Sequence, residues 1–148
     1  MDNNRALNYL ALGKKGRLVE LGEEPVGAVA RAVKARLVVV ASDASDHTWR
    51  RAKSFVAGTE QQCIRVPFTK EELGFVVGRT SLAIAAFTDA ALALAFVKAL
   101  PNSEKFKDVL EQLDLKAKKL RQRKDEAKAH QRNVRTGKVR RAPVTKKD

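Results

Sequence analysis

An unbroken apolar run from Leu37 to Ala41 constrains the fold most, because it leads directly into a small polar turn and then into a helical pattern. A run without polar alternation is typical of a strand that is covered on both faces, as in a sheet between layers of helices. In such sheets ligands collect beyond the carboxyl ends of strands, where helix N-termini present N–H groups. Ser45 or Asp46 can also simply cap the following helix. The turn is therefore the first place to look for a site.

Extended and helical patterns alternate along the first hundred residues with short links between them. The expected strands are residues 17–21, 37–41, 63–66 and 82–87, and helical patterns precede, separate and follow them. This alternation predicts an α/β fold, a three-layer α-β-α sandwich around a four-stranded mixed sheet.

Capping residues set the expected limits of the helices. Asn3 or Asn4 is expected to cap the first helix, and Gly13 is expected to end it. Thr69 and Glu72 match a capping box. The inner face of the second expected helix carries Val26, Val29, Ala30 and Val33, and the helix after the capping box bears Leu73, Phe75 and Val76.

The chain is expected to divide at Pro101 into a domain of residues 1–100 and a C-terminal basic helix and tail of residues 101–148. A helical stripe with a docked first half is expected at Phe106, Val109, Leu110, Leu113 and Leu120. Residues 116–147 contain 14 Lys or Arg and only two acids. Such a block buries little surface, and we expect a frayed helix that leads to a disordered tail.

The net charge indicates the class of partner. Lys and Arg number 30 against 17 acids, which gives a formal charge of +13. Residues 1–100 carry +4 of this excess and residues 101–148 carry +9. This balance predicts a polyanionic partner, with nucleic acid ahead of an anionic membrane.

Few residues are available for disulfides, metals or catalysis. The lone Cys63 excludes an intramolecular disulfide, and His47 and His130 assemble no recognisable zinc pattern. No Ser-His-Asp, Cys-His or P-loop arrangement is evident. We therefore expect no catalytic residues, no metal and no cofactor.

The sequence favours a cytoplasmic protein without a membrane segment. The start of the chain lacks the positive charge of a signal peptide. The most apolar segment, Leu82 to Leu100, carries Thr88 and Asp89 at its middle, where a charge in a membrane is costly. A buried strand, a cap and a helix explain this segment better.

Four stretches together resemble the ribosomal protein L-seven-Ae family of kink-turn RNA-binding proteins, most closely its bacterial YlxQ-type members. They are RLVELGEE from Arg17, AxDASxxT from Ala41, ELGFVVGR from Glu72 and FTDAALA from Phe87. The resemblance covers residues 7 to about 100, and it implies a four-stranded sheet between helices that binds structured, kinked RNA. The expected partners are ribosomal RNA and the ribosome or its assembly intermediates, and the expected state is a monomer.

The resemblance also implies which two loops contact RNA. The first is Gly22, Glu23 and Glu24, which match the YlxQ-type pattern GEE, together with a basic residue at Arg31. The archaeal pattern G-x-N-E-x-x-K matches this chain only at Gly22. The second loop is Gly78 to Leu82, in which Arg79 is expected to contact phosphate, beside Thr80 and Ser81, while Leu82 packs on an unstacked base.

Further cations are expected beside these loops on one phosphate-binding rim, namely Lys14, Lys15, Arg17, Arg31, Lys34 and Arg36. Ordinary solvated charges on helix turns are the alternative for Arg31, Lys34 and Arg36. Glu23 and Glu24 either accept hydrogen bonds from base amino groups or complement the helix dipole. Trp49 and Phe55 lie six residues apart, off one common helix face, which favours packing or support over base stacking.

These features favour a non-catalytic RNA-binding protein. Two alternatives are a protein-interaction adaptor that uses the amphipathic helix from Ser103 to Leu120, and a substrate-binding module detached from an RNA methyltransferase. The methyltransferase alternative would require a catalytic domain of roughly 150 further residues. RNA binding should be lost in high salt and on RNase treatment, whereas adaptor binding should survive both.

Overall fold

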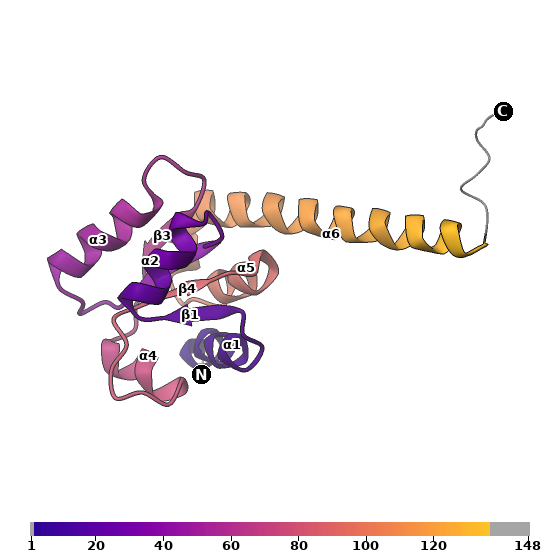
Figure 1. Ribbon diagram of the computed structural model, residues 1–148. Helices are drawn as coiled ribbons and strands as arrows, with labels where there is room; N and C mark the ends of the chain where they lie inside the picture. Colours follow the sequence, from indigo (N-terminus) through magenta and orange to yellow (C-terminus); the bar gives the residue numbers. More distant parts are fainter. Residues whose placement is uncertain (1, 137–148) are drawn as a thin grey trace. The chain divides into compact units, whose positions relative to one another are not determined.

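The computed structural model describes residues 2–136 and, within that range, the side chains of residues 5–131 (Figure 1). It contains two units, residues 1–114 and residues 115–148. We call the first the compact unit and residues 115–136 of the second the basic helix segment. Each is described separately below.

The compact unit is built on a four-stranded sheet with the order β1-β4-β2-β3. The strands are β1 (Val19–Leu21), β2 (Leu37–Val40), β3 (Gln62–Arg65) and β4 (Ile84–Phe87). β4 is antiparallel to both β1 and β2, whereas β2 and β3 are parallel. The predicted mixed sheet is confirmed.

Both central strands are fully buried. Every residue of β2 and of β4 is buried, and Leu37 lies opposite Phe87 on one side and Gln62 on the other. The Phe87 ring packs against that of Phe96 with 4.9 Å between the ring centroids. The apolar run of β2 is thus explained by helices on both faces of the sheet.

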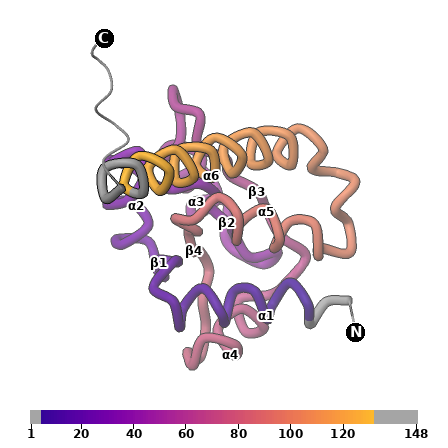
Figure 2. The backbone as a smooth tube through the Cα atoms, turned by 90° about the vertical axis from the view of Figure 1, so that its right-hand side faces the viewer, coloured from indigo at the N-terminus to yellow at the C-terminus, as the bar shows by residue number. Residues whose placement is uncertain are grey.

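Helices form the two outer layers, which confirms the three-layer architecture. On one face lie α2 (Glu23–Arg31) and α3 (Asp46–Val56), which contact each other and the strands. On the other lie α1 (Asp2–Lys15), α4 (Lys70–Val76) and α5 (Ala90–Lys98), with α1 in contact with both α4 and α5. Figures 1 and 2 show α1 and α4 together on the side away from α2.

The expected limits of α1 were wrong at both ends. Asn3 and Asn4 lie inside the helix, and Gly13 does not end it, because α1 continues to Lys15. A Cβ atom at Gly13 would lie 2.6 Å from Val19 Cγ1 and 3.0 Å from Leu92 Cδ2. The glycine is therefore required for close packing of the helix rather than for its termination.

The end of α2 also differs from the prediction. Val26 and Ala30 are buried and Val29 is partly buried, as expected, but Val33 is 52% exposed. The helix ends at Arg31, and Val33 follows in the left-handed region with φ 57°. Because the helical period stops before residue 33, the Val33 side chain leaves the inner face.

Local capping signals were read correctly. The Ser45 hydroxyl accepts a hydrogen bond from the Thr48 amide at the start of α3, and Thr69 and Glu72 form the predicted capping box of α4. Asp89 caps α5 by accepting a hydrogen bond from the Leu92 amide at 2.8 Å. Residues 82–100 thus comprise a strand, a cap and a helix. Among the described residues, no helix has the length and apolar character needed to cross a membrane.

A 3-10 helix, η1 (Ser103–Phe106), follows a turn at residues 101–102 and leads into α6 (Lys107–Thr136). At the start of α6, Leu113 is buried in the core and Val109 and Leu110 pack against it. The basic helix segment continues as α-helix to Thr136, and the fraying expected there stays a prediction. The remainder of the expected tail, residues 137–148, lies outside the described residues.

Candidate nucleic-acid interface

Strand direction determines which loops meet. β1, β2 and β3 point the same way and β4 points the opposite way, so three strands end where β4 begins. We call this side of the sheet the loop edge; it consists of residues 22–24, 41–45, 66–69 and 78–83. The opposite edge consists of residues 17–18, 32–36, 57–61 and 88–89.

Gly22 starts the loop edge in a conformation that other residues rarely adopt. Its φ is 97° and its ψ is 159°, a region that is essentially restricted to glycine. Its amide donates to the Ile84 carbonyl at 3.0 Å, and its carbonyl accepts from the Val26 amide at 3.1 Å. Gly22 therefore links the end of the sheet ladder directly to the first turn of α2.

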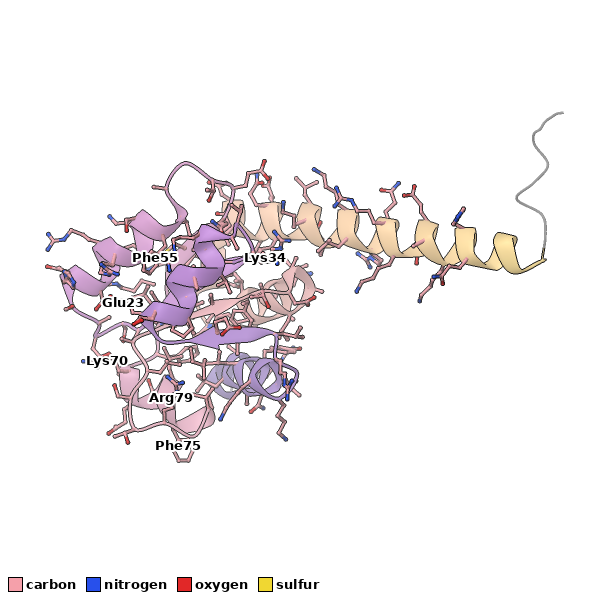
Figure 3. The ribbon with its side chains drawn as sticks, in the orientation of Figure 1. Glu23, Lys34, Phe55, Lys70, Phe75 and Arg79 are labelled. Carbon is pink, nitrogen blue, oxygen red and sulfur yellow. The ribbon has the colours of Figure 1, made fainter. Side chains whose placement is uncertain are left out.

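The second predicted loop lies beside the first. A Cβ atom at Gly22 would lie 3.6 Å from Nη1 of Arg79. Figure 3 shows Glu23, from α2, and Arg79, from the loop after α4, at the same edge of the sheet. The structure thus brings Gly22 and Arg79 together, although they are far apart in the sequence.

Lys14 reaches the start of this second loop from α1. Its Nζ donates to the Val77 carbonyl at 2.7 Å and lies 3.7 Å from the position of a Cβ atom at Gly78. An ammonium group at the carbonyl end of α4 is electrostatically favourable. Lys15 is exposed in the same last turn of α1.

The loop is held against α4 by glycine contacts. Arg79 donates its amide to the Gly74 carbonyl at 2.8 Å. A Cβ atom at Gly74 would lie 2.8 Å from the Arg79 carbonyl oxygen and 2.9 Å from the Ser81 backbone. A larger residue at position 74 would have to displace the loop, so the loop geometry depends on this glycine.

The two acidic residues of the first loop have different surroundings. Glu23 forms an ion pair with Arg51 of α3, with 2.6 Å between Oε2 and Nε, and both side chains are partly exposed. Glu24 is exposed. The pairing offsets one of the two negative charges at the start of α2, and it ties α2 to α3.

Leu82 is not on the surface. Thr80 and Ser81 are exposed, whereas Leu82 is 3% exposed and belongs to the core. Its amide donates to the Lys70 carbonyl at 2.9 Å. The Leu82 side chain is therefore not open to an unstacked base, contrary to the expectation from the sequence.

Three predicted cations lie at the opposite edge. Arg17 precedes β1, and Lys34 and Arg36 precede β2, so all three are at the strand ends remote from Gly22. Arg31 is in the last turn of α2, also remote from Gly22, and Figure 3 shows Lys34 far from Glu23. The expectation of a single rim was wrong, because those residues precede strands whose far ends form the loop edge. Their role in RNA binding stays a prediction.

Three residues near the loop edge were not among the predicted site residues. Asp43 Oδ1 accepts the Lys70 amide at 2.8 Å, which joins the turn after β2 to α4. Phe75 of α4 is 83% exposed. The spacing could have shown this, because the buried Leu73 and Val77 are four residues apart and Phe75 lies midway between them, on the far side of the helix.

Trp49 and Phe55 act as supports, as expected. Both are partly buried and pack against the core. The guanidinium of Arg65 and the ammonium of Lys53 lie 5.1 and 5.4 Å from the centroid of the Trp49 ring system. Arg51 lies 5.4 Å from the Phe55 ring centroid. These cations occupy the surroundings of both rings, so neither ring is an open stacking surface.

The described part of the chain offers little for metal binding or for catalysis by a thiol nucleophile. Among the described residues, no three His, Cys, Asp or Glu side chains gather in a way that could hold a metal ion. Burial raises the pKa of the Cys63 thiol from 9.0 to about 12, and nearby Lys53 only partly opposes this shift. A thiol that stays protonated is a poor nucleophile.

Comparisons with known proteins identify a shared fold. No protein-family model matches the chain, and no curated protein matches its sequence. A solved protein of unknown function from Bacillus halodurans aligns with a TM-score of 0.59 and 22% identity over 64% of this chain and 95% of its own. The 15.5 kD RNA-binding protein of Giardia lamblia aligns with a TM-score of 0.58 and 16% identity over 73% of this chain and 89% of its own.

Proposed function

We propose that this protein is a non-catalytic RNA-binding protein that recognises structured RNA through the loop edge. The observation that carries the proposal is the meeting of Gly22 with Arg79 at one end of the sheet, with Lys14 at the base of the second loop. The solved RNA-binding protein from Giardia lamblia, which has a similar fold, supports this proposal.

The loop edge carries groups suited to a folded nucleic acid. Arg79 offers a fork of donors for a phosphate, and Thr80 and Ser81 are exposed hydroxyls. Glu24 is an exposed acceptor for a base amino group, whereas Glu23 is engaged with Arg51. Acids and cations are mixed here, so this edge is better suited to selecting an RNA shape than to attracting RNA by charge.

The basic helix segment supplies the attraction in this proposal. Its cations include Lys119, Arg121, Arg123, Lys124 and Lys128, all exposed on one continuous helix. If six cations of residues 116–147 neutralised phosphates, the logarithm of the affinity would fall by about five per tenfold rise in salt. Selection by shape and attraction by charge would then be experimentally separable.

The finer assignment follows the sequence resemblance. We propose that the chain is an L-seven-Ae-like protein of the YlxQ type, and that it binds ribosomal RNA, on the ribosome or during its assembly. A kink-turn-like RNA is the proposed target class. Glu24, Pro25 and Ala28 stand where the archaeal pattern has Asn, Glu and Lys. Binding should therefore tolerate changes in the base pairs that the archaeal residues would contact.

The adaptor alternative loses its main support in the fold. The apolar stripe from Ser103 was to dock a partner, yet Val109, Leu110 and Leu113 already pack within the compact unit. RNA binding is therefore the function that we put to the test.

A charge-matched pair of variants tests the proposed interface. Crosslinking to cellular RNA and sequencing of the bound fragments would provide the ligand, and fluorescence anisotropy the affinity. Arg79→Gln should weaken binding by about tenfold, since one charge-assisted contact contributes about 1.5–3 kcal/mol. Arg17→Gln at the opposite edge, with the same change of charge, should weaken it by no more than about twofold, which is its share of non-specific attraction. Equal losses would refute the loop edge as the binding site.

A further inference from the structure

Phe75 stands out among the large apolar side chains of the compact unit. It is 83% exposed, more than Leu12, Leu18 or Val33, which are 55%, 37% and 52% exposed. Figure 3 shows its ring projecting outward from α4 below Arg79. At this exposure most of the ring is open to solvent and available to a ligand.

The backbone around Phe75 is firmly held. α4 is closed at its start by the Thr69–Glu72 capping box and at its end by Gly78, whose φ is 76°. The Phe75 carbonyl accepts the Gly78 amide at 3.3 Å, and the adjoining Gly74 carbonyl accepts the Arg79 amide. Phe75, in the last turn of α4, and Arg79, just beyond the helix, are therefore joined by the hydrogen bonds that close its end.

Cations lie at the end of α4 that follows Phe75, and acids lie at its start. Lys14 is hydrogen-bonded to the Val77 carbonyl, two residues from Phe75, and Arg79 is four residues from it. On α4 itself the acids Glu71 and Glu72 precede Phe75 by four and three residues. Glu72 Oε1 accepts the Thr69 amide at the start of the helix, and Glu71 is exposed. An exposed aromatic with two cations at the same helix end matches a nucleotide, which has a flat base and an anionic phosphate.

We propose that Phe75 is a stacking platform for an unpaired base of the bound RNA, next to the phosphate contact of Arg79. The inference rests on the proposed function and adds a requirement for the RNA. The RNA must present an unstacked nucleotide, as a bulge or a loop does. The exposed ring of Phe75 then stacks on the unpaired base, a contact that the buried Leu82 cannot make. A fully paired duplex offers no base face to the ring.

Three RNA probes and the full-length protein test this inference at low ionic strength. The probes are a fully paired hairpin, the same hairpin with an unpaired bulge, and the bulged hairpin with abasic nucleotides in the bulge. Phe75→Ala should weaken binding to the bulged hairpin by about ten- to a hundredfold, the usual loss when a stacking aromatic is removed. Affinities for the paired and the abasic hairpins should not change.

Two variants serve as controls. Phe75→Tyr keeps a ring and should retain the affinity for the bulged hairpin. Val33→Ala removes exposed apolar surface at the opposite edge and should change no affinity. Because residue 75 is exposed, all three variants should unfold at a urea concentration close to that of the wild type, which separates binding from folding.

The outcomes distinguish the inference from the proposed function. If the wild type binds none of the hairpins, the proposed function fails and this inference with it. If the bulged hairpin binds and Arg79→Gln weakens it, but Phe75→Ala does not, the proposed function stands and the stacking role is refuted. The same pattern is expected if Phe75 instead docks into a protein partner. Equal losses on all three hairpins would also refute stacking.

Discussion

The compact unit and the basic helix segment of this chain use their side chains in opposite ways. The compact unit buries Phe68, Phe87 and Phe96 completely and mixes acids with cations on its surface. The basic helix segment has few apolar residues and many exposed cations. The first fixes the shape of two loops, and the second carries many cations along one helix. Under the proposed function, selectivity and salt-dependent affinity would reside in different parts of the chain.

The largest expected contrast concerns stability. Phe87→Ala removes a ring that is 0% exposed and should lower the free energy of unfolding by about 3–5 kcal/mol. Lys119→Ala in the basic helix segment should change it by less than about 0.5 kcal/mol. Urea unfolding followed by circular dichroism measures both. Similar losses would show that the two parts are one cooperative structure.

Thiol chemistry gives the next contrast. Because burial raises the pKa of Cys63 to about 12, its thiolate fraction at pH 8 should be lower than that of an exposed thiol by roughly two to three orders of magnitude. Iodoacetamide should label Cys63 correspondingly slowly, and a cysteine introduced as Gln122→Cys at an ordinary rate. Comparable rates for the two thiols would contradict the burial of Cys63.

The same shift sets a pH dependence of stability. The folded state holds the Cys63 proton more tightly than the unfolded state, whose thiol has its ordinary pKa of 9.0. The contribution of the protonated Cys63 thiol to the free energy of unfolding is therefore complete below about pH 9 and is lost as the pH rises towards 12. Cys63→Ala should remove this alkaline component from the urea midpoints.

A smaller effect is expected from charge removal in the basic helix segment. The triple change Lys119→Gln, Arg121→Gln and Lys124→Gln should reduce the salt slope of RNA binding by about 2.7 if all three cations contact duplex phosphates. If the affinities of the variant and the wild type are equal at about 1 M salt, the loss at about 0.1 M is roughly 500-fold. Discrimination between bulged and paired hairpins should persist. A loss of discrimination would contradict the division of labour between the two parts.

The smallest effect concerns a helix cap in the compact unit. Ser45→Ala removes the hydroxyl that accepts the Thr48 amide at 3.1 Å and should cost about 1 kcal/mol of unfolding free energy. Ser54→Ala in the same helix removes a hydroxyl that donates to the Arg51 carbonyl, and should cost close to nothing. Thermal unfolding of the two variants makes the comparison.

The sequence predicted what local interactions determine. The Ser45 cap, the capping box and the apolar run of β2 depend on residues within a few positions of one another, and all were read correctly. Gly13 was misread because its reason lies in contacts with Val19 and Leu92, which only the folded chain brings close.

The candidate site was predictable in part for the same reason. The two loops around Gly22 and Arg79 carry local signals, but their distance from Arg17 and Lys34 depends on the antiparallel pairing of β1 with β4. That pairing joins residues more than sixty positions apart and leaves no periodic trace in either segment. The burial of Leu82 follows from how α4 and its loop pack, whereas the exposure of Phe75 could have been predicted from its spacing relative to Leu73 and Val77.

The position of β4 in the middle of the sheet also has a consequence for protein synthesis. β1 pairs only with β4 among the described strands, and β4 separates it from β2. During translation, β1 has no strand to pair with until β4, which ends at Phe87, has left the ribosomal exit tunnel. The nascent N-terminal half therefore cannot assemble the sheet on its own, and the amide of Gly22 cannot reach the Ile84 carbonyl before β4 has been synthesised.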